Sequence, residues 1–296
     1  MYLGAFSSLL KTNDPLMAVD LLNQSLVVQC LDFQATHILV LALCPVTLFT
    51  LNLLKRQHIV TAHWFYEDFR AAYYWKDVIS GYSYFFAIQK GPIVDECKKH
   101  KTTFMFLPTA AGMQQETGHL HDTGHDVAFV GIPSVYRISL LEHLVNSGIK
   151  PVIAGYGWNR YNGILVPYIV CGAWTEAAQA MRILYNTKIG INISVNNPQS
   201  DIENTHISPR VFDVMKAGCV LLTEEVPLIH EILPDCNFHT FSCLEDACDK
   251  ITAILGSFEK ELASINNNRE IIEHKHLYRH RVKRIISACG GQFGVF

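Results

Sequence analysis

Charged residues are scarce in this sequence of 296 residues, where Asp, Glu, Lys and Arg together make up 17%, against about 25% in typical globular domains. Hydrophobic residues make up 49%, so the composition excludes an intrinsically disordered chain and supplies enough apolar surface for sizeable cores. The 24 basic and 27 acidic residues leave a formal net charge of −3. Because such a chain has no broad positive field, we expect no nucleic-acid partner.

The sequence also lacks CxxC pairs, and its nine cysteines are an odd number scattered along the chain. This pattern excludes a secreted disulfide framework and predicts reduced thiols in a cytoplasmic protein. The first residues, MYLGAFSSLLKTNDP, contain neither a basic segment nor a small-residue cleavage site. We therefore expect no signal peptide.

An uninterrupted run of apolar residues long enough to cross a bilayer is missing as well. The segment that comes nearest covers residues 36–54, but Pro45 lies in its middle and Thr47, Thr50 and Asn52 interrupt its second half. Short apolar runs bounded by turn residues are typical of strands in parallel sheets. The segment is therefore predicted to form a strand and a helix, and we expect no membrane span.

Several nucleotide-binding and hydrolytic signatures are absent. The sequence has no GxxxxGK[ST], which excludes a P-loop hydrolase, and no GxGxxG after its first strand, which argues against dinucleotide binding. It has no GxSxG elbow of the α/β-hydrolases. It also has no DxD pair that would supply ligands for a metal-bound diphosphate.

What is present is an alternation of strands and helices, which is typical of parallel βαβ units. The predicted strands cover 38–43, 59–62, 84–88, 103–107, 127–131, 152–155, 189–195 and 220–223. The predicted helices cover 46–56, 92–100, 137–147, 208–217, 247–257 and 259–283. Residues 109–125 have no periodicity and are interpreted as a linker.

This pattern predicts an α/β protein with two Rossmann-like parallel-sheet domains, the first of them short. We expect an N-terminal domain with linker at residues 1–125 and a second domain at 126–270. Residues 271–296 are expected to form a C-terminal helix that packs back toward the first domain. Ligands of such sheets bind beyond the carboxyl ends of the strands, so we expect a site in a cleft between the domains.

The stretch THISPRVFDVMKAGCVLLTEE, residues 205–225, is the most informative one. Ser208 is a suitable helix N-cap and Pro209 a suitable first helical residue. Arg210 then lies in the first turn, where the helix dipole already favours an anion. The helix N-terminus and Arg210 together could therefore hold a diphosphate. Asp213 follows one turn later and could hold ribose hydroxyls. The alternative is an ordinary crossover helix with an exposed Arg–Asp pair.

The same stretch resembles the signature R-x-F-E-x-x-x-x-G-x-x-L-L-T of the CgeB-type glycosyltransferases, a branch of the two-domain GT-B sugar transferases. Three further stretches resemble that family in order and spacing: DVAFVGIPSVYRISLLEHLVNSGIKPVIAGYGW, LYNTKIGINIS and HLYRHRV. The resemblance covers about residues 126–285. It implies the GT-B fold, in which the second domain binds the nucleotide-sugar donor and the first domain binds the acceptor.

The resemblance also implies roles for individual residues. Asp213 stands where related enzymes carry the second Glu of a Glu-seven-residues-Glu pair, which holds the donor ribose, and Arg210 would face the diphosphate. Thr205 occupies the position of the first Glu, a departure that affects the expected contact with the donor sugar. The other residues expected near the donor are Gly131, Arg137, Gly155, Gly157, Trp158, Thr223 and Glu224.

His63 is a candidate catalytic residue on the acceptor side. It follows the predicted strand 59–62, so it would point from the carboxyl end of that strand into the cleft, where it could deprotonate the attacking hydroxyl. Glu67 and Asp68 follow closely and could orient its ring. The alternative is a buried histidine that packs among Trp64 and its aromatic neighbours.

Two histidine groups share the spacing H-x-H-x-x-x-H: His119, His121 and His125, and then His274, His276 and His280. The first group lies in the predicted linker and part of the second belongs to the closing HLYRHRV motif, so we expect no metal and no other cofactor. The predicted function is transfer of a sugar from a nucleoside-diphosphate-sugar to a hydroxyl of an unidentified glycan, protein or small molecule. The alternative is a non-catalytic GT-B-fold protein that serves in binding or surface assembly.

Overall fold

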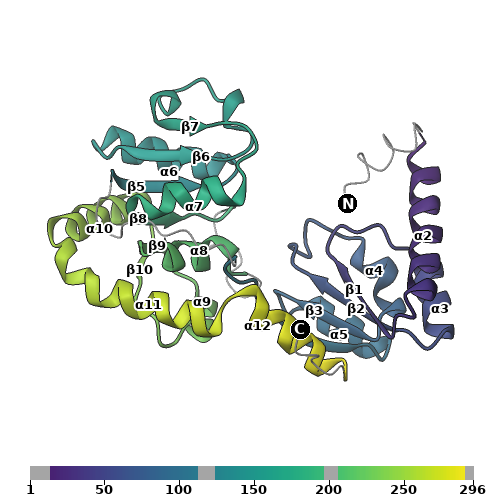
Figure 1. Cartoon of the computed structure of the whole chain (residues 1–296). Coiled ribbons are helices and arrows are strands. Elements are labelled where there is room, and N and C mark those ends of the chain that lie inside the picture. The colour runs from purple at the N-terminus through teal and green to yellow at the C-terminus, as the bar shows by residue number, and fades with distance from the viewer. Residues whose placement is uncertain (1–13, 113–123, 197–205, 291–296) are drawn as a thin grey trace. The chain divides into compact units, whose positions relative to one another are not determined.

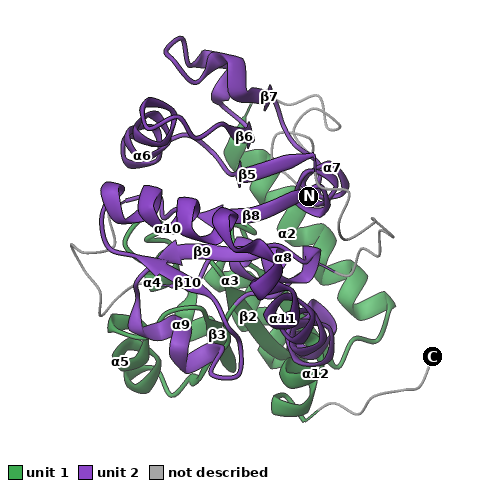
Figure 2. Ribbon diagram, turned by 90° about the vertical axis from the view of Figure 1, so that its left-hand side faces the viewer, with its two compact units in different colours: residues 1–108, 282–296 green, residues 109–281 purple. Residues whose placement is uncertain are grey.

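A computed structural model describes residues 14–112, 124–196 and 206–290. The chain divides into two compact units, which Figure 2 distinguishes by colour. Unit 1 comprises residues 1–108 and 282–296, and unit 2 comprises residues 109–281. The unit boundaries therefore fall after residue 108 and after residue 281. The boundaries expected from the sequence were after residue 125 and after residue 270. No helix among the described residues is both long and apolar enough to span a bilayer.

Unit 1 is built on a four-stranded parallel sheet in the order β1-β2-β3-β4. Its strands are β1 (His37–Leu41), β2 (Val60–Phe65), β3 (Tyr84–Ala87) and β4 (Thr103–Phe106). Its helices are α2 (Pro15–Asp32), α3 (Leu48–Arg56), α4 (Trp75–Val78) and α5 (Pro92–Lys99), together with the second part of α12 (Tyr278–Ala288). The core joins sheet residues such as Phe65 and Phe85 to Leu51 of α3 and Ile93 of α5.

Unit 2 contains a six-stranded parallel sheet in the order β10-β9-β8-β5-β6-β7. Its strands are β5 (His125–Val130), β6 (Pro151–Ala154), β7 (Ile169–Cys171), β8 (Thr187–Asn192), β9 (Val220–Glu224) and β10 (His239–Phe241). Its helices are α6 (Val135–Asn146), α7 (Ala177–Tyr185), α8 (Pro209–Ala217), α9 (Pro227–Ile232), α10 (Leu244–Gly256) and α11 (Leu262–Lys275), with the start of α12. The strand order reverses between β5 and β8, as in doubly wound folds.

Helices cover both faces of this sheet, because alternate strand residues point to opposite sides. Ala128 and Val130 of β5 belong to the core beneath α7 and α8, whereas Val127 and Phe129 belong to the core beneath α6 and α10. Figures 1 and 2 show α7 and α8 on one side of the strands and α6 and α10 on the other. The expected α/β class with two parallel-sheet domains is confirmed.

The C-terminal region differs from the single helix predicted over 259–283. The structure has two helices, α11 and α12, which are separated at His276 and Leu277. Leu277 forms a parallel bridge with Ala111, and Ala111 N donates to His276 O at 2.9 Å while Tyr278 N donates to Ala111 O at 3.2 Å. These backbone bonds replace helical ones, so the connection after Pro108 decides where α11 ends. The last helix then continues into unit 1, where His37 Nε2 lies 3.0 Å from Cys289 O.

Candidate functional site

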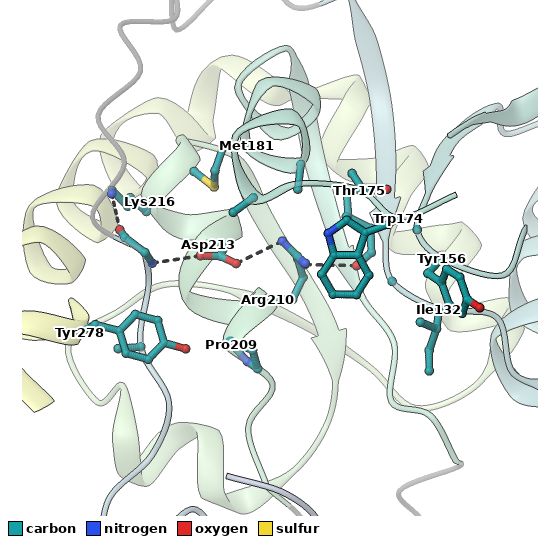
Figure 3. Close-up of a pocket in the computed structure, with 17 residues that line it drawn as sticks. Ile132, Tyr156, Trp174, Thr175, Met181, Pro209, Arg210, Asp213, Lys216 and Tyr278 are labelled. Atoms are coloured by element: carbon teal, nitrogen blue, oxygen red, sulfur yellow. Dashed lines mark hydrogen bonds and ion pairs between the residues drawn. The ribbon is translucent and has the colours of Figure 1, made fainter. Parts of the chain in front are cut away.

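A pocket of about 430 Å³ lies in unit 2, at the carboxyl ends of β5 and β6 and beside the start of α8 (Figure 3). Doubly wound sheets place ligands at this edge, near the point where the strand order reverses. The described residues that line it are Ala110, Gly112, Val130, Gly131, Ile132, Gly155, Tyr156, Trp174, Thr175, Ala177, Ala180, Met181, Pro209, Arg210, Asp213, Lys216 and Tyr278.

Helix α8 begins and ends as its sequence predicts. The Ser208 hydroxyl accepts a hydrogen bond from Arg210 N at 3.2 Å, Pro209 is the first helical residue, and Gly218 ends the helix with a φ of 84°. Val211 N also donates to Ser208 O at 3.1 Å. The first N–H groups of α8 are thus already bonded, so the helix offers a ligand its dipole and the Arg210 side chain.

Three charged residues at intervals of three, Arg210, Asp213 and Lys216, line the pocket from one face of α8. Arg210 Nη1 donates to Asp213 Oδ2 at 3.1 Å, and Arg210 Nε donates to Val130 O at 3.1 Å. Asp213 Oδ1 accepts a longer bond from Gly112 N at 3.4 Å. Lys216 Nζ donates to Gly112 O. Figure 3 shows the resulting chain of bonds from Lys216 past Asp213 to Arg210 along the pocket wall.

Burial and charge have opposite effects on the Asp213 carboxyl. Its side chain is only 18% exposed, and burial raises its pKa, while the Arg210 guanidinium opposes that increase. Burial also lowers the pKa of the Lys216 amine, because the charged form is the one that loses hydration. The sequence interpretation included Arg210 and Asp213 but missed Lys216. Its spacing of three residues from Asp213 was the signal that could have included it.

The pocket floor is formed by backbone. Gly155 has a φ of 145°, and a Cβ atom there would lie 2.2 Å from Gly131 O. Gly131 N donates to Ala154 O at 2.9 Å, so the β5 and β6 loops touch through their main chains. Trp158 Nε1 donates to Gly131 O at 2.7 Å from within the core. Gly131 and Gly155 thus line the pocket as expected from the sequence, whereas Trp158 supports Gly131 from behind.

Gly157 also lies outside the described lining. Its φ is 100°, and a Cβ atom there would meet Pro133 at 3.2 Å. These two constraints account for a glycine at this position, so no contact with a ligand is needed to explain it. Arg137 is 9% exposed and donates from Nε to Ile193 O and from Nη1 to Ile132 O, both at 2.9 Å. We expected Arg137 near phosphates, but its guanidinium binds backbone carbonyls and holds two loops together.

Thr223 and Glu224 end β9 and are both 2% exposed. Thr223 Oγ1 accepts from Asn192 Nδ2 at 2.8 Å, and Glu224 Oε1 accepts from Ser194 N at 2.5 Å. Glu224 Oε2 has no hydrogen-bond partner among the residues that the structure describes. Burial raises the pKa of Glu224 to about 7, although Ser194 N and Arg137 favour its ionised form. Both residues support the loops around the pocket and are absent from its described lining.

Two exposed aromatic residues line the pocket on the side away from Lys216. Tyr156 is 53% exposed and Trp174 is 67% exposed. In Figure 3 the Trp174 ring lies beside Arg210, and Tyr156 follows it along the wall. An aromatic face that stays open to solvent in a pocket can stack on a planar or apolar ligand surface. The sequence interpretation included neither residue, because neither belongs to a recognised motif.

His63 requires a correction to its expected position. Strand β2 extends to Phe65, so His63 lies within the strand instead of after it, and its exposure is 0%. Its ring stacks on Tyr82 with 4.8 Å between centroids, and Nε2 lies 3.3 Å from the Tyr74 hydroxyl. Burial lowers the pKa of His63 to about 3. These contacts favour the packing alternative that the sequence left open.

The carboxyls proposed to orient His63 lie in the following segment. Asp68 Oδ2 forms an ion pair with Arg70 Nη2 at 2.6 Å. Burial raises the pKa of the Glu67 carboxyl. Asp68 therefore has a charged partner within its own loop. This ion pair accounts for an acidic residue at position 68 without any role in orienting His63.

Two histidines of the second group, His276 and His280, also have structural partners. The His276 ring stacks on Phe212 with 5.6 Å between centroids, and His280 Nδ1 accepts from Leu277 N at 3.1 Å. Among the described residues, no group of three or more His, Cys, Asp or Glu side chains could hold a metal ion. His119, His121 and Thr205 lie outside the described residues, so the structure gives no position for them.

Solved structures with the same fold include several sugar transferases. Sucrose-phosphate synthase from Thermosynechococcus elongatus aligns over 92% of this chain and 77% of its own, with a TM-score of 0.62 and 9% identity. Anabaena HepE, solved with UDP and glucose, aligns over 98% and 84%, with a TM-score of 0.62 and 8% identity. S. aureus TarM, solved with UDP, aligns over 86% and 55%, with a TM-score of 0.56 and 12% identity.

At these identities the structural likeness shows the fold, which is GT-B. A search of curated proteins gave no match. The profile of the glycosyl transferase-like family, by contrast, matches residues 137–287. This span contains α8, the charged face of the pocket and the closing HLYRHRV motif, and it makes up half of the chain. The chain therefore belongs to the glycosyl transferase-like family.

Proposed function

We propose that this protein transfers a sugar from a nucleoside-diphosphate-sugar to a hydroxyl group, and that the pocket of unit 2 binds the donor. One observation carries the proposal: an arginine in the first turn of α8 faces a pocket at the carboxyl ends of β5 and β6. The family match supports the transferase activity. HepE and TarM were each solved with UDP, so UDP-sugars are the first donors to test.

Arg210 would stabilise the leaving group. When the bond between the sugar and the diphosphate breaks, negative charge accumulates on the diphosphate oxygens, and a fixed guanidinium beside them lowers the barrier. Arg210 is held in place for this role by Asp213 and by the Val130 carbonyl. The dipole of α8 acts in the same direction. This scheme requires no metal ion, and we propose that activity survives excess EDTA.

Asp213 and the aromatic residues would position the nucleoside. A carboxylate offers about four acceptor sites, so Asp213 could accept bonds from ribose hydroxyls while it keeps those from Arg210 and Gly112. Trp174 and Tyr156 would stack on the base, since both rings are exposed where they line the pocket.

The finer assignments rest on the sequence. The four motifs resemble those of the CgeB-type branch, and we propose that the chain is a member. All nine cysteines lie in described parts of the chain and are free thiols, which supports a cytoplasmic protein. We propose no residue as the base that activates the acceptor, because His63 is buried in the core of unit 1.

A non-catalytic binding protein is the second candidate, and the burial of His63 is the observation that favours it. The decisive experiment incubates the protein with UDP-, GDP- and dTDP-sugars, with and without EDTA, and quantifies the released nucleotide. The same ligands are tested for binding by calorimetry. Release that is lost in Arg210→Ala supports the transferase, binding without release supports the second candidate, and the absence of both contradicts the proposal.

A further inference from the structure

A second pocket, of about 520 Å³, lies at the other edge of the unit 2 sheet. His239, the first residue of β10, lines it, so this pocket is at the amino ends of the strands, whereas the pocket beside α8 is at their carboxyl ends. Its walls come from α9, the loop before β10, the 3₁₀ helix η6 (Phe258–Glu261) and the first turn of α11. The described lining residues with nitrogen or oxygen in their side chains are His230, Asn237, His239, Lys260, Glu261 and Ser264. The proposed transfer reaction uses none of them.

One wall of this pocket, the loop 233–238, is held in place by two asparagines of α11. Asn268 is 2% exposed; its Oδ1 accepts a hydrogen bond from Asn237 N at 2.9 Å, and its Nδ2 donates to Asn237 O. Asn267 Nδ2 donates to Asp235 O at 3.3 Å. Asparagine is an unfavourable residue inside a helix, so these contacts fix the loop at the expense of helix propensity. A wall that is already fixed loses less entropy when a ligand binds.

Some polar atoms of this pocket have no partner among the residues that the structure describes. They include the Asn237 side-chain amide, the Lys260 amine and the Ser264 hydroxyl. His239 Nε2 lies 3.2 Å from Glu261 Oε1. Because a carboxylate can only accept, Nε2 carries the ring proton, and Nδ1 of the neutral ring is an acceptor. The pocket therefore presents donors and acceptors together.

His230 supplies another acceptor in the same way. Its Nε2 lies 2.9 Å from Glu225 Oε1, so in the neutral ring Nδ1 is an acceptor. The His230 ring lies 5.1 Å from that of Phe238, centroid to centroid, and Phe238 and Pro234 give the pocket an apolar wall. An apolar wall beside a few placed polar groups is typical of small-molecule sites.

The mixture of donors and acceptors distinguishes between classes of ligand. A phosphate or a carboxylate carries only acceptors, so it could use Lys260 but would face the acceptor nitrogens of the two histidines and the Glu261 carboxylate. A hydroxyl group both donates and accepts, so a ligand with several hydroxyls can pair with either kind of group. Sugar rings have such hydroxyls, and they also have an apolar C–H face that can contact Phe238.

We propose that this pocket binds a sugar ring, and that it is a carbohydrate site separate from the donor pocket. The inference goes beyond the proposed function and does not depend on it, because no nucleotide takes part. Asn237 and Ser264 would exchange hydrogen bonds with hydroxyls, Lys260 would donate, and the two histidine rings would accept. If the polar side chains served only to keep this surface hydrated, no sugar would bind here.

The experiment measures the Kd of glucose, N-acetylglucosamine, maltose and inorganic phosphate by NMR titration at pH 8, well above the ordinary pKa of imidazole. It compares the native chain with Asn237→Ala and Lys260→Ala, which remove side chains that have no partner among the described residues. We expect at least one sugar to bind, and each variant to weaken it about three- to tenfold, the equivalent of one hydrogen bond. Asn266→Ala is the matched control, since Asn266 is an exposed residue of α11 outside the described lining.

A second set of titrations separates this pocket from the donor pocket. Each sugar is titrated again with excess UDP present and in Arg210→Ala, and its Kd should stay within about twofold of the native value. Sugar binding that is lost in either case, or that is equal in the native chain and both pocket variants, would overturn the proposal. Binding of no sugar would do the same, whether or not phosphate binds through Lys260. If a sugar bound in an Asn237-dependent manner and UDP did not bind, the carbohydrate site would stand and the proposed function would fail.

Discussion

Gly155 lies directly against the Gly131 carbonyl, so that a Cβ atom at Gly155 would be 2.2 Å from that oxygen. The obstacle is backbone, which cannot rotate away as a side chain can. The same residue has a φ of 145°, which side-chain-bearing residues rarely adopt. Two independent constraints thus require glycine at this point, and both concern the floor of the proposed donor pocket.

We predict that Gly155→Ala destabilises the fold by about 1–3 kcal/mol, the range for a backbone clash combined with an unfavourable φ. The free energy of unfolding in denaturant measures this. Gly148→Ala is the matched control, because Gly148 also has a positive φ, 83°, but an added Cβ there would meet nothing within 4 Å. The control should lose clearly less stability. Equal losses in the two variants would mean that contact with Gly131 contributes nothing.

Arg210→Ala should weaken binding of a nucleoside diphosphate by about 1.5–3 kcal/mol, the usual contribution of a charge-assisted hydrogen bond. The arginine side chain is 24% exposed and makes its bonds at the pocket wall, so the fold should change little. Calorimetry with UDP measures the effect, and Arg182→Ala on the exposed side of α7 is a control for loss of a positive charge. Unchanged UDP affinity in Arg210→Ala would remove the diphosphate from this position.

Trp174→Ala should weaken binding of both UDP and uridine by about 1–3 kcal/mol, the range measured for stacking of a base on an aromatic side chain. Because the base is common to the two ligands, both affinities should fall by a similar factor. Trp174→Phe should retain most of the affinity. NMR titration with uridine provides the measurement, and native affinity in Trp174→Ala would place the base elsewhere.

Local signals predicted some elements closely. Helix α8 was expected over 208–217 and is found at Pro209–Ala217 with Ser208 as its N-cap, because Ser-Pro and Gly218 define its ends within the sequence itself. The end of α11 was not predictable in this way. Its position depends on the bridge between Ala111 and Leu277, residues that are far apart in the sequence. Helix α2 was also missed, since its apolar residues follow no helical period.

The candidate site shows the same division. Arg210 and Asp213 were found from their place in a recognisable helix start, and the structure brings them together in one pocket. Arg137, Thr223 and Glu224 were expected at the donor because they belong to the same motifs, but their side chains bind backbone and neighbouring strands. A motif records that a residue type is required, and both ligand contact and loop support can require it. The spatial arrangement distinguishes the two.

Glu224 provides a prediction about pH. Its pKa is raised from 4.5 to about 7 by burial, so between these values the folded chain binds a proton that the unfolded chain has lost. This contribution therefore makes the native chain less stable as pH rises from 4.5 to 7. Glu224→Gln removes it while keeping an acceptor for Ser194 N. The stability of the variant relative to the native chain should increase by roughly 2 kcal/mol between pH 5 and pH 8.

Chemical denaturation at the two pH values measures this difference, and Glu259→Gln, an exposed residue, is the control. A relative stability that does not change with pH would show that Glu224 ionises normally. The charge of Arg137 beside it would then be the dominant influence.

His63 distinguishes packing from catalysis. Its ring is fully buried, stacks on Tyr82 and contacts Phe85 at a tilted angle, so His63→Ala should lower stability by about 2–4 kcal/mol through the cavity that it leaves. Activity per folded molecule should remain near native. If His63 were instead the base that activates the acceptor, turnover would fall about 10²–10⁴-fold in a variant that remains folded. Turnover and unfolding are therefore measured on the same preparation.

The pH dependence of stability tests the same point without a cavity. Because burial lowers the pKa of His63 to about 3, the unfolded chain takes up a proton below pH 6.5 that the folded chain refuses. The native chain should therefore lose stability as pH falls from 6.5 toward 3. His63→Phe keeps a ring to stack on Tyr82 but cannot be protonated, so its unfolding free energy should depend less on pH over this range. If native and variant curves stayed parallel, His63 would be protonated in the folded chain, and a buried neutral packing role would be excluded. If they diverged and turnover per folded His63→Phe molecule stayed native, the general base would have to be a different residue.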